Sequence, residues 1–170
     1  MEPNAIIYTS NTGYTRQYAV MLGEKTGLPV YSLNDKKEIP SGCTAVYLGW
    51  LMAGKIKGYG KAAKLFNIAA VCGVGLSETG TLIDEVSKSN SIPAGIPLFT
   101  LQGGFDRDKL KGINKFMISM LTKGLASKKQ LTEQEQRMFE LLNKDASYVS
   151  EENLRDILHW YASKGCTVDK

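Results

Sequence analysis

The sequence has few residues with which to build a metal site or a disulfide framework. Its 170 residues include three cysteines and a single histidine, His159, and no two cysteines have C-x-x-C spacing. Zinc-ligand spacing is therefore absent, and an odd number of cysteines does not indicate a set of structural disulfides. We expect no metal ion, and we expect Cys43 and Cys72, which lie in apolar runs, to be buried thiols.

Long hydrophobic runs are also missing. None approaches the ~18 residues of a membrane-spanning helix, and the first residues, Met-Glu-Pro-Asn, lack the basic segment that opens a signal peptide. We therefore expect a cytoplasmic protein. With 43% apolar and 22% charged residues, the composition is that of a packed globular chain. At this length a single domain spanning residues 1–170 is expected.

The positive charge is small, but it is concentrated in one stretch. The formal net charge is +4, which does not favour nucleic-acid binding. Residues 105–130 hold seven Lys or Arg against two Asp or Glu, whereas residues 131–170 hold five against eight. The basic excess therefore belongs to one segment and not to the whole chain.

Short apolar runs alternate with helix-like segments through the first hundred residues. The runs lie at 5–9, 30–33, 45–49, 68–74 and 96–101, and helical patterns lie at 15–25, 61–66 and 82–88. Strands that are apolar on both faces and alternate with helices are typical of a parallel sheet covered on each side, the α/β class. Only Asn34–Gly42 separates the second and third runs, so we expect a short or irregular helix there.

Helices alone are predicted in the remaining part of the chain, near 108–123, 132–143 and 151–163. Thr132 and Glu135 have the spacing of a capping box at the start of the second of these helices. The last helix can cover the sheet. Residues 105–149 are therefore predicted to form a helical insertion before it.

A turn rich in hydroxyl groups links the first predicted strand to the first predicted helix. Its residues are Ser10, Asn11, Thr12, Gly13, Tyr14 and Thr15. A strand-to-helix turn directs free backbone N–H groups at one point, where the helix dipole adds a partial positive charge. Hydroxyl and amide donors at that point suit a phosphate. The turn is thus interpreted as a phosphate site, and the alternative is a turn that only caps the helix.

Other anion-binding patterns are not met. A nucleotide-hydrolysing P-loop requires G-K-[ST], and this turn has no lysine. The nearest approach to a dinucleotide fingerprint, Gly73-Val74-Gly75, lacks the third glycine. A receiver domain would need acidic residues after the first and third strands. A thiol phosphatase would need Arg six residues after Cys72, where Glu78 stands.

The segment Ile6-Ile7-Tyr8-Thr9-Ser10-Asn11-Thr12-Gly13-Tyr14-Thr15 resembles the [ST]-x-T-G-x-T phosphate loop of the flavodoxin family. The resemblance implies a flavodoxin-like three-layer sandwich, a five-stranded parallel sheet of order 2-1-3-4-5, and FMN bound with its phosphate in this loop. It further implies an electron-transfer protein that works with redox partner proteins.

By the same resemblance, the loops after the third and fourth strands hold the flavin ring. The implied residues are Trp50, Leu51, Met52, Ala53 and Gly54 in the first loop and Gly75, Leu76, Ser77, Glu78, Thr79 and Gly80 in the second. The second loop has no aromatic residue. Trp50 or Tyr59 can supply ring stacking, or Trp50 can belong to the core. We assign no catalytic acid or base, since the chemistry would be that of the flavin itself.

The tail has a narrower resemblance. The turn Gln102-Gly103-Gly104-Phe105-Asp106, followed by a basic apolar helix and a closing helix, resembles the menaquinone-dependent protoporphyrinogen oxidase branch of the flavodoxin-like proteins. It implies an alternative function, an FMN-dependent oxidoreductase with a quinone as acceptor. A third hypothesis is a module without flavin that binds a partner through its basic insertion.

The predicted helix 108–123 has a wide apolar face. At 100° per residue, an arc of about 200° contains Leu110, Ile113, Phe116, Met117, Ile118, Met120 and Leu121. Lys111, Lys115 and Lys123 occupy the remaining side. Such a helix is docked on its own domain or meets a membrane surface, a quinone or a partner, and the sequence leaves both alternatives open.

Overall fold

A central parallel sheet organises the chain in the computed structural model, which describes residues 2–106, 112–143 and 145–168. The parallel strands have the order β2-β1-β3-β5-β6, which confirms the predicted fold class and strand order. Their bounds are Ala5–Thr9 (β1), Val30–Ser32 (β2), Thr44–Met52 (β3), Asn67–Gly75 (β5) and Leu98–Gln102 (β6). Strand β1 lies between β2 and β3, in parallel register with β3 from Ala5 opposite Ala45 to Thr9 opposite Gly49.

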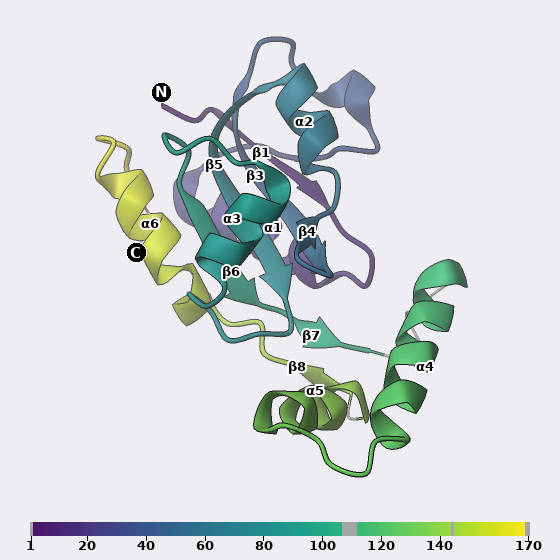
Figure 1. The fold of residues 1–170 in the computed structure, drawn as a ribbon. Helices are drawn as coiled ribbons and strands as arrows, with labels where there is room; N and C mark the ends of the chain where they lie inside the picture. The colour runs from purple at the N-terminus through teal and green to yellow at the C-terminus, as the bar shows by residue number, and fades with distance from the viewer. Residues whose placement is uncertain (1, 107–111, 144, 169–170) are drawn as a thin grey trace.

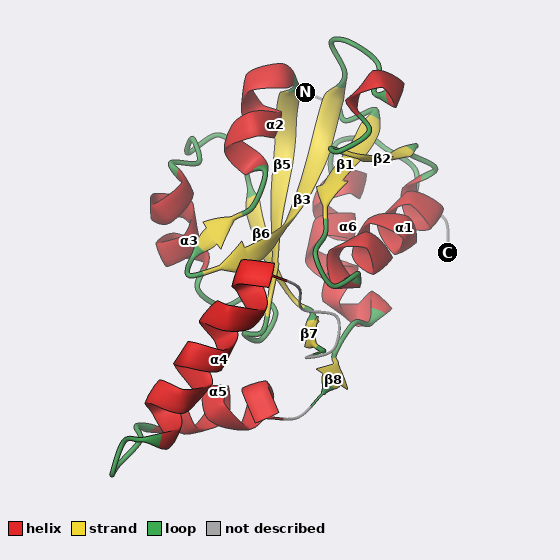
Figure 2. Cartoon of the chain, turned by 90° about the vertical axis from the view of Figure 1, so that its right-hand side faces the viewer, coloured by secondary structure: helices red, strands yellow, loops and turns green. Residues whose placement is uncertain are grey.

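Helices cover both faces of the sheet (Figure 2). Helices α1 (Tyr14–Thr26) and α6 (Arg155–Ala162) lie on one face, and α2 (Tyr59–Leu65) and α3 (Ile83–Asn90) lie on the other. Because alternate strand residues point to opposite faces, Ile6 packs with the α1 side and Ile7 with the α2 side, and both are fully buried. The short connection between β2 and β3 contains a 3-10 helix, Lys36–Glu38, as expected.

The third strand is longer than predicted. It continues through Met52 and turns back as β4 (Lys55–Ile56), which pairs antiparallel with β3. Ala53 and Gly54 form the two-residue turn, both with positive φ, 48° and 73°, as a type I′ hairpin requires. The prediction of an open loop from Trp50 was therefore wrong. Alanine is rare at a left-handed turn position, so the sequence carried no clear hairpin signal.

The helical insertion is enclosed by a two-stranded ribbon. Strand β7 (Gly104–Phe105) pairs antiparallel with β8 (Ala146–Ser147), and α4 (Gly112–Ala126) and α5 (Glu133–Asn143) lie between them. The first residues of the predicted helix 108–123, up to 111, lie outside the described residues. Figure 1 shows the insertion below the sandwich, with α4 standing out to one side.

Two features hold the insertion together. The predicted capping box is confirmed: the Thr132 N–H donates to Glu135 Oε2 at 3.1 Å, and the Glu135 N–H donates to Thr132 Oγ1 at 3.2 Å. A small core also forms from Phe105, Leu125 and Leu142, which are buried.

The predicted helix 151–163 begins as a 3-10 turn, Glu151–Leu154, before α6. Within the described ranges, no helix has the length and apolar character needed to cross a membrane.

Candidate functional site

The hydroxyl-rich turn 10–15 lies at the carboxyl end of β1, where the sheet order reverses between β2 and β3. Ligands of open α/β sheets bind at this type of position. Gly13 is the N-cap residue of α1 and has φ of 98°, a left-handed conformation that glycine adopts without strain. Its N–H donates to Ser10 Oγ at 3.1 Å. The Ser10 side chain therefore holds the turn closed.

The surroundings of the turn favour an anion. Helix α1 has no acidic residue in its first turn, so no carboxylate there competes for the positive end of the helix dipole. A Cβ placed on Gly13 would meet no atom within 4 Å, which leaves the backbone open on that side. Asn11 is exposed and Thr12 is half-buried, whereas Thr15 is buried. The accessible donors of the turn thus lie before Thr15.

The first segment that was predicted to hold a flavin ring is a fixed hairpin. Trp50, Leu51 and Met52 belong to β3, and Ala53 and Gly54 form the turn. Asn90 of α3 holds this turn, since its Nδ2 donates to the Gly54 carbonyl at 2.8 Å and its Oδ1 accepts from the Ile56 N–H at 2.8 Å. The backbone at Gly54 is therefore attached to the sandwich by side-chain hydrogen bonds.

Leu51 lies against the glycines of β5. A Cβ on Gly73 or on Gly75 would come 3.1 Å from Leu51 Cδ1. The space beside the two glycines is thus filled by the Leu51 side chain from the neighbouring strand. This explains in structural terms why a pair of glycines stands here without a phosphate-binding turn.

A buried tyrosine supports the hairpin from below. The Tyr47 hydroxyl lies 2.6 Å from the Lys57 carbonyl oxygen and 2.9 Å from Thr9 Oγ1. Burial raises the pKa of Tyr47 to about 12, and the hydrogen bond to Thr9 opposes that shift. A Cβ on Gly58 would lie 2.2 Å from this hydroxyl, so only glycine allows the chain to approach so closely. Tyr47, in the middle of β3, thereby joins the end of β1 to the segment after β4.

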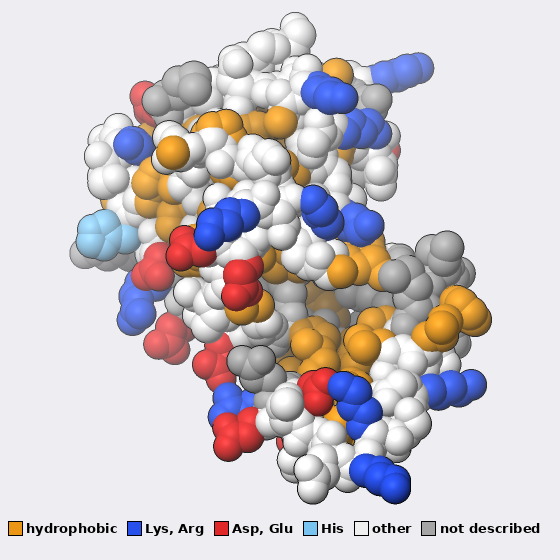
Figure 3. All heavy atoms as spheres, in the orientation of Figure 1, with side chains coloured by type: hydrophobic (Ala, Val, Ile, Leu, Met, Phe, Trp, Pro, Cys, Tyr) orange, Lys and Arg blue, Asp and Glu red, His pale blue; other side chains and the backbone are white. Residues whose placement is uncertain are grey.

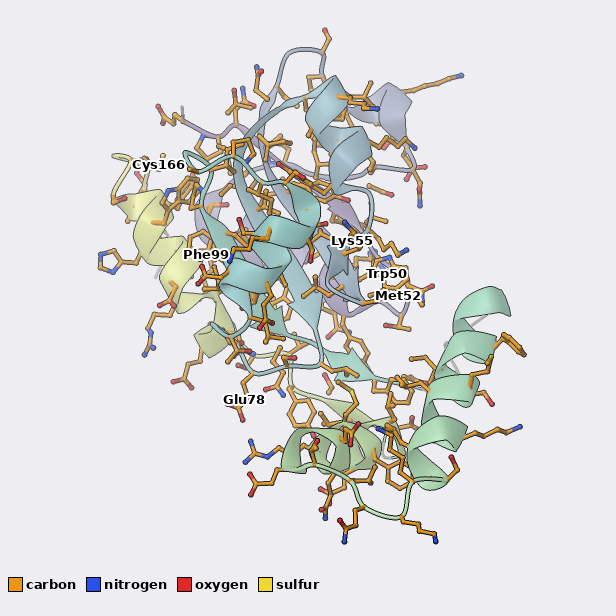
Figure 4. All side chains as sticks on the ribbon, viewed as in Figure 1. Trp50, Met52, Lys55, Glu78, Phe99 and Cys166 are labelled. Carbon is orange, nitrogen blue, oxygen red and sulfur yellow. The ribbon has the colours of Figure 1, made fainter. Side chains whose placement is uncertain are left out.

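The second segment that was predicted to hold a flavin ring, 75–80, is attached to β6. The Gln102 N–H donates to Thr79 Oγ1 at 2.9 Å, and Gln102 Nε2 donates to the Leu76 carbonyl at 3.1 Å. The Leu76 side chain packs against the insertion core, while Glu78 is exposed. In Figure 4, Trp50, Met52 and Lys55 lie on the flank of the sandwich nearest α4, and Glu78 lies at its lower end.

The aromatic candidates differ in position. Trp50 is half-buried, and the Lys57 ammonium lies 5.7 Å from its ring centroid, a cation–π contact. Tyr59 is buried in the core, with its ring centroid 6.3 Å from that of Tyr47. Trp50 is therefore the better placed of the two to contact a ligand.

Tyr14 connects the turn to the insertion, a relationship that the sequence pattern did not reveal. A Cβ on Gly104 would lie 2.6 Å from Tyr14 Cζ and 2.5 Å from the Ala146 carbonyl oxygen. Asn90 and Tyr47 were missed as well. Each of the three residues acts through contacts with another element or with residues far away in the sequence. The double glycine 103–104 was the one sequence signal for the close contact between Gly104 and Tyr14.

The remaining features contribute no further ligand groups to this site. Cys43 and Cys72 are buried free thiols, as predicted, and burial raises the pKa of both. His159 is exposed on α6. Among the described residues, no His, Cys, Asp and Glu side chains gather into a group that could hold a metal ion. A cavity of about 220 Å³ among Asn4, Pro29 and Pro40 lies at the opposite edge of the sheet.

No protein-family model, curated protein or solved structure matches the chain.

Proposed function

We propose that the protein binds FMN and transfers electrons between redox partners. The observation that carries this proposal is the turn 10–15 at the carboxyl end of β1, with Gly13 at φ of 98° and no acid in the first turn of α1. One phosphate fits this arrangement. Among the described residues, the Gly73-Val74-Gly75 segment offers no place for a pyrophosphate, because Leu51 lies against Gly73 and Gly75.

The flanking segments suit a planar apolar ring. Trp50 and Met52 lie on the hairpin, and Asn90 fixes the backbone at Gly54. When bound, FMN supplies one- and two-electron chemistry. The chain's own residues would bind the phosphate at the turn and orient the ring between the hairpin and residues 75–80. Leu76, which packs on the insertion core, would contribute to excluding water from one side.

An absorption spectrum of the purified protein tests the proposal. We expect a yellow protein whose released chromophore has the mass of FMN, followed by stoichiometric bleaching in an anaerobic reductive titration. Protein from which the flavin has been removed should be colourless and should bind added FMN, with quenching of the flavin fluorescence. A protein that neither contains nor binds FMN would refute the proposal and favour the module without flavin, and release of FAD would refute the single-phosphate site.

A second function has one observation in its favour. Phe116, Met120 and Leu121 of α4 are exposed, and α4 is joined through Ile118 to the cluster that contains Leu76. An apolar surface next to the ring-binding segments suits a hydrophobic acceptor, so we also propose an FMN-dependent oxidoreductase with a quinone as acceptor. Steady-state reduction of a soluble quinone, with protoporphyrinogen as the electron donor that the resemblance implies, is expected of the oxidoreductase and not of a carrier, and so distinguishes the two functions.

A further inference from the structure

The outer face of α4 exposes large apolar side chains to water, and a patch of this kind marks an interaction site. Phe116, Met120 and Leu121 are 64%, 60% and 47% exposed. At 100° per residue, Phe116 and Met120 lie about 40° apart and form the outer face. Leu121 lies about 140° from Phe116, and Ile118 and Leu125 lie about 160–180° from it. Ile118 and Leu125 pack in the insertion core. One side of α4 is therefore docked on its own domain, and the other side is open.

The segment that contains this face carries charge of one sign in the sequence. Residues 109–132 contain six lysines and no Asp or Glu. Lys123 is exposed in the last turn of α4, and Lys129 is exposed in the loop that follows. Lys128 pairs with Glu135 at 2.5 Å. The open apolar face is thus accompanied by cationic side chains, as Figure 3 shows for the outer edge of the insertion.

The positive charge of this segment favours some binding partners of the open face over others. A second copy of the chain would bring two lysine-rich helices together, and their like charges would repel. An anionic lipid surface accepts the apolar side chains in its interface and attracts the lysines at the same time. We propose that α4 binds flat on the surface of an anionic phospholipid bilayer, with Phe116 and Met120 inserted and the lysines at the lipid phosphates.

The same contact would orient the candidate site. Leu76, which follows β5, shares a cluster with Ile118 and Leu125 of α4. Trp50, Met52 and Lys55 lie on the flank of the sandwich nearest α4 (Figure 4). Binding through α4 therefore places this flank next to the bilayer. The membrane contact itself does not depend on a bound flavin, so it stands or falls separately from the proposed function.

Vesicle sedimentation of the full chain tests this inference. We expect the protein to pellet with vesicles of phosphatidylglycerol and phosphatidylcholine at low salt and to remain in the supernatant with phosphatidylcholine alone. Raising NaCl from about 50 to 500 mM should release it, because screening shortens the range of the lysine attraction. A protein that stays in solution with the anionic vesicles at low salt overturns the inference.

Variants separate the apolar and charged contributions. Phe116→Ser/Met120→Ser should lower partitioning at least about tenfold, and Lys123→Gln/Lys129→Gln should lower it about fivefold for each lysine. All four side chains are exposed, so the melting temperature should hold. Leu65→Ser, which removes an exposed leucine from α2, is the control and should bind as the unaltered protein does.

Two further results would overturn the inference. One is binding that persists when the Phe116, Met120, Lys123 and Lys129 substitutions are combined, which would place the lipid contact elsewhere. The other is a dimer in sedimentation velocity that Phe116→Ser dissociates, which would assign the α4 face to self-association.

Discussion

Gly104 lies directly against the ring of Tyr14, so that a Cβ on Gly104 would stand 2.6 Å from Tyr14 Cζ. Tyr14 belongs to the hydroxyl-rich turn and is the first residue of α1. Gly104 is the first residue of β7, the strand that leads into the insertion. Residues ninety positions apart therefore share one contact, and a change at the start of the insertion is transmitted to the turn.

Gly104→Ala should disturb both partners of this contact. The added methyl group would clash with the Tyr14 ring and with the Ala146 carbonyl oxygen at 2.5 Å. Such overpacking costs about 1–3 kcal/mol. We expect a lower free energy of unfolding in urea, together with weaker FMN binding because Tyr14 must move. Gly60→Ala, where a Cβ meets nothing within 4 Å, should change neither quantity for the worse.

Thr12→Ala tests the proposed phosphate contact. Thr12 is half-buried in the turn, and loss of its hydroxyl should weaken FMN binding by about 0.5–1.5 kcal/mol, or about 3 kcal/mol if the hydroxyl donates to the charged phosphate. Fluorescence titration with FMN measures the change. Thr44→Ala, at the opposite edge of the sheet, is the control. Equal affinities for all three proteins would place the phosphate away from this turn.

Asn90→Ala should loosen the hairpin. The substitution leaves the Gly54 carbonyl and the Ile56 N–H without their side-chain partner. Leaving such groups unpaired costs about 1–3 kcal/mol where water cannot replace the partner. Urea denaturation should show this loss, and amide exchange should rise at Ile56. The control is Asn67→Ala, which replaces an exposed asparagine at the start of β5 and should leave both measurements unchanged. If Asn90→Ala also leaves them unchanged, the turn is stable without the Asn90 hydrogen bonds.

Alkaline pH should destabilise the protein through Tyr47. Its folded pKa of about 12 exceeds the ordinary value of about 10 because burial disfavours the phenolate. Below pH 10 both states keep the proton; between pH 10 and 12 the unfolded state loses it first, so stability falls by up to about 2–3 kcal/mol. The Tyr18, Tyr59 and Tyr161 pKa values are raised by burial as well and add to the same trend.

Tyr47→Phe is the matching variant. It should lower stability at pH 7, because the Lys57 carbonyl loses its partner at 2.6 Å, and it should flatten the fall between pH 10 and 12. Thermal unfolding monitored by circular dichroism across this range measures both effects. Tyr148→Phe, which removes an exposed phenol, is the control. An unchanged alkaline slope in Tyr47→Phe would contradict the assignment.

Periodicity and turn chemistry determined much of the fold from the sequence alone. Buried runs such as 5–9 and 68–74 are apolar on both faces, and that pattern holds only for strands covered on both sides. Gly27 ends α1 in the left-handed conformation, and Thr132 with Glu135 begins α5. These signals are local, since each depends on residues within about four positions of one another.

The site was only partly determined in this way. The turn 10–15 is contiguous, so its hydroxyls and glycine were visible as a pattern, and the strand order then placed it where β1 meets β3. The hairpin after β3 was not visible, because Ala53 adopts a left-handed φ that its residue type does not favour. Asn90, from a helix more than thirty residues later, compensates by binding both sides of that turn.

Tertiary structure alone decided how the apolar arc of α4 is divided. Every residue of the arc has the same chemical character in the sequence, and hydrophobic burial is not directional. Packing against α5 and Phe105 selected Ile118 for the insertion core and left Phe116 and Met120 in solvent. The sequence by itself determined that the helix is amphipathic and basic. Which part of its apolar face remains available to a partner depends on contacts between residues far apart in the chain.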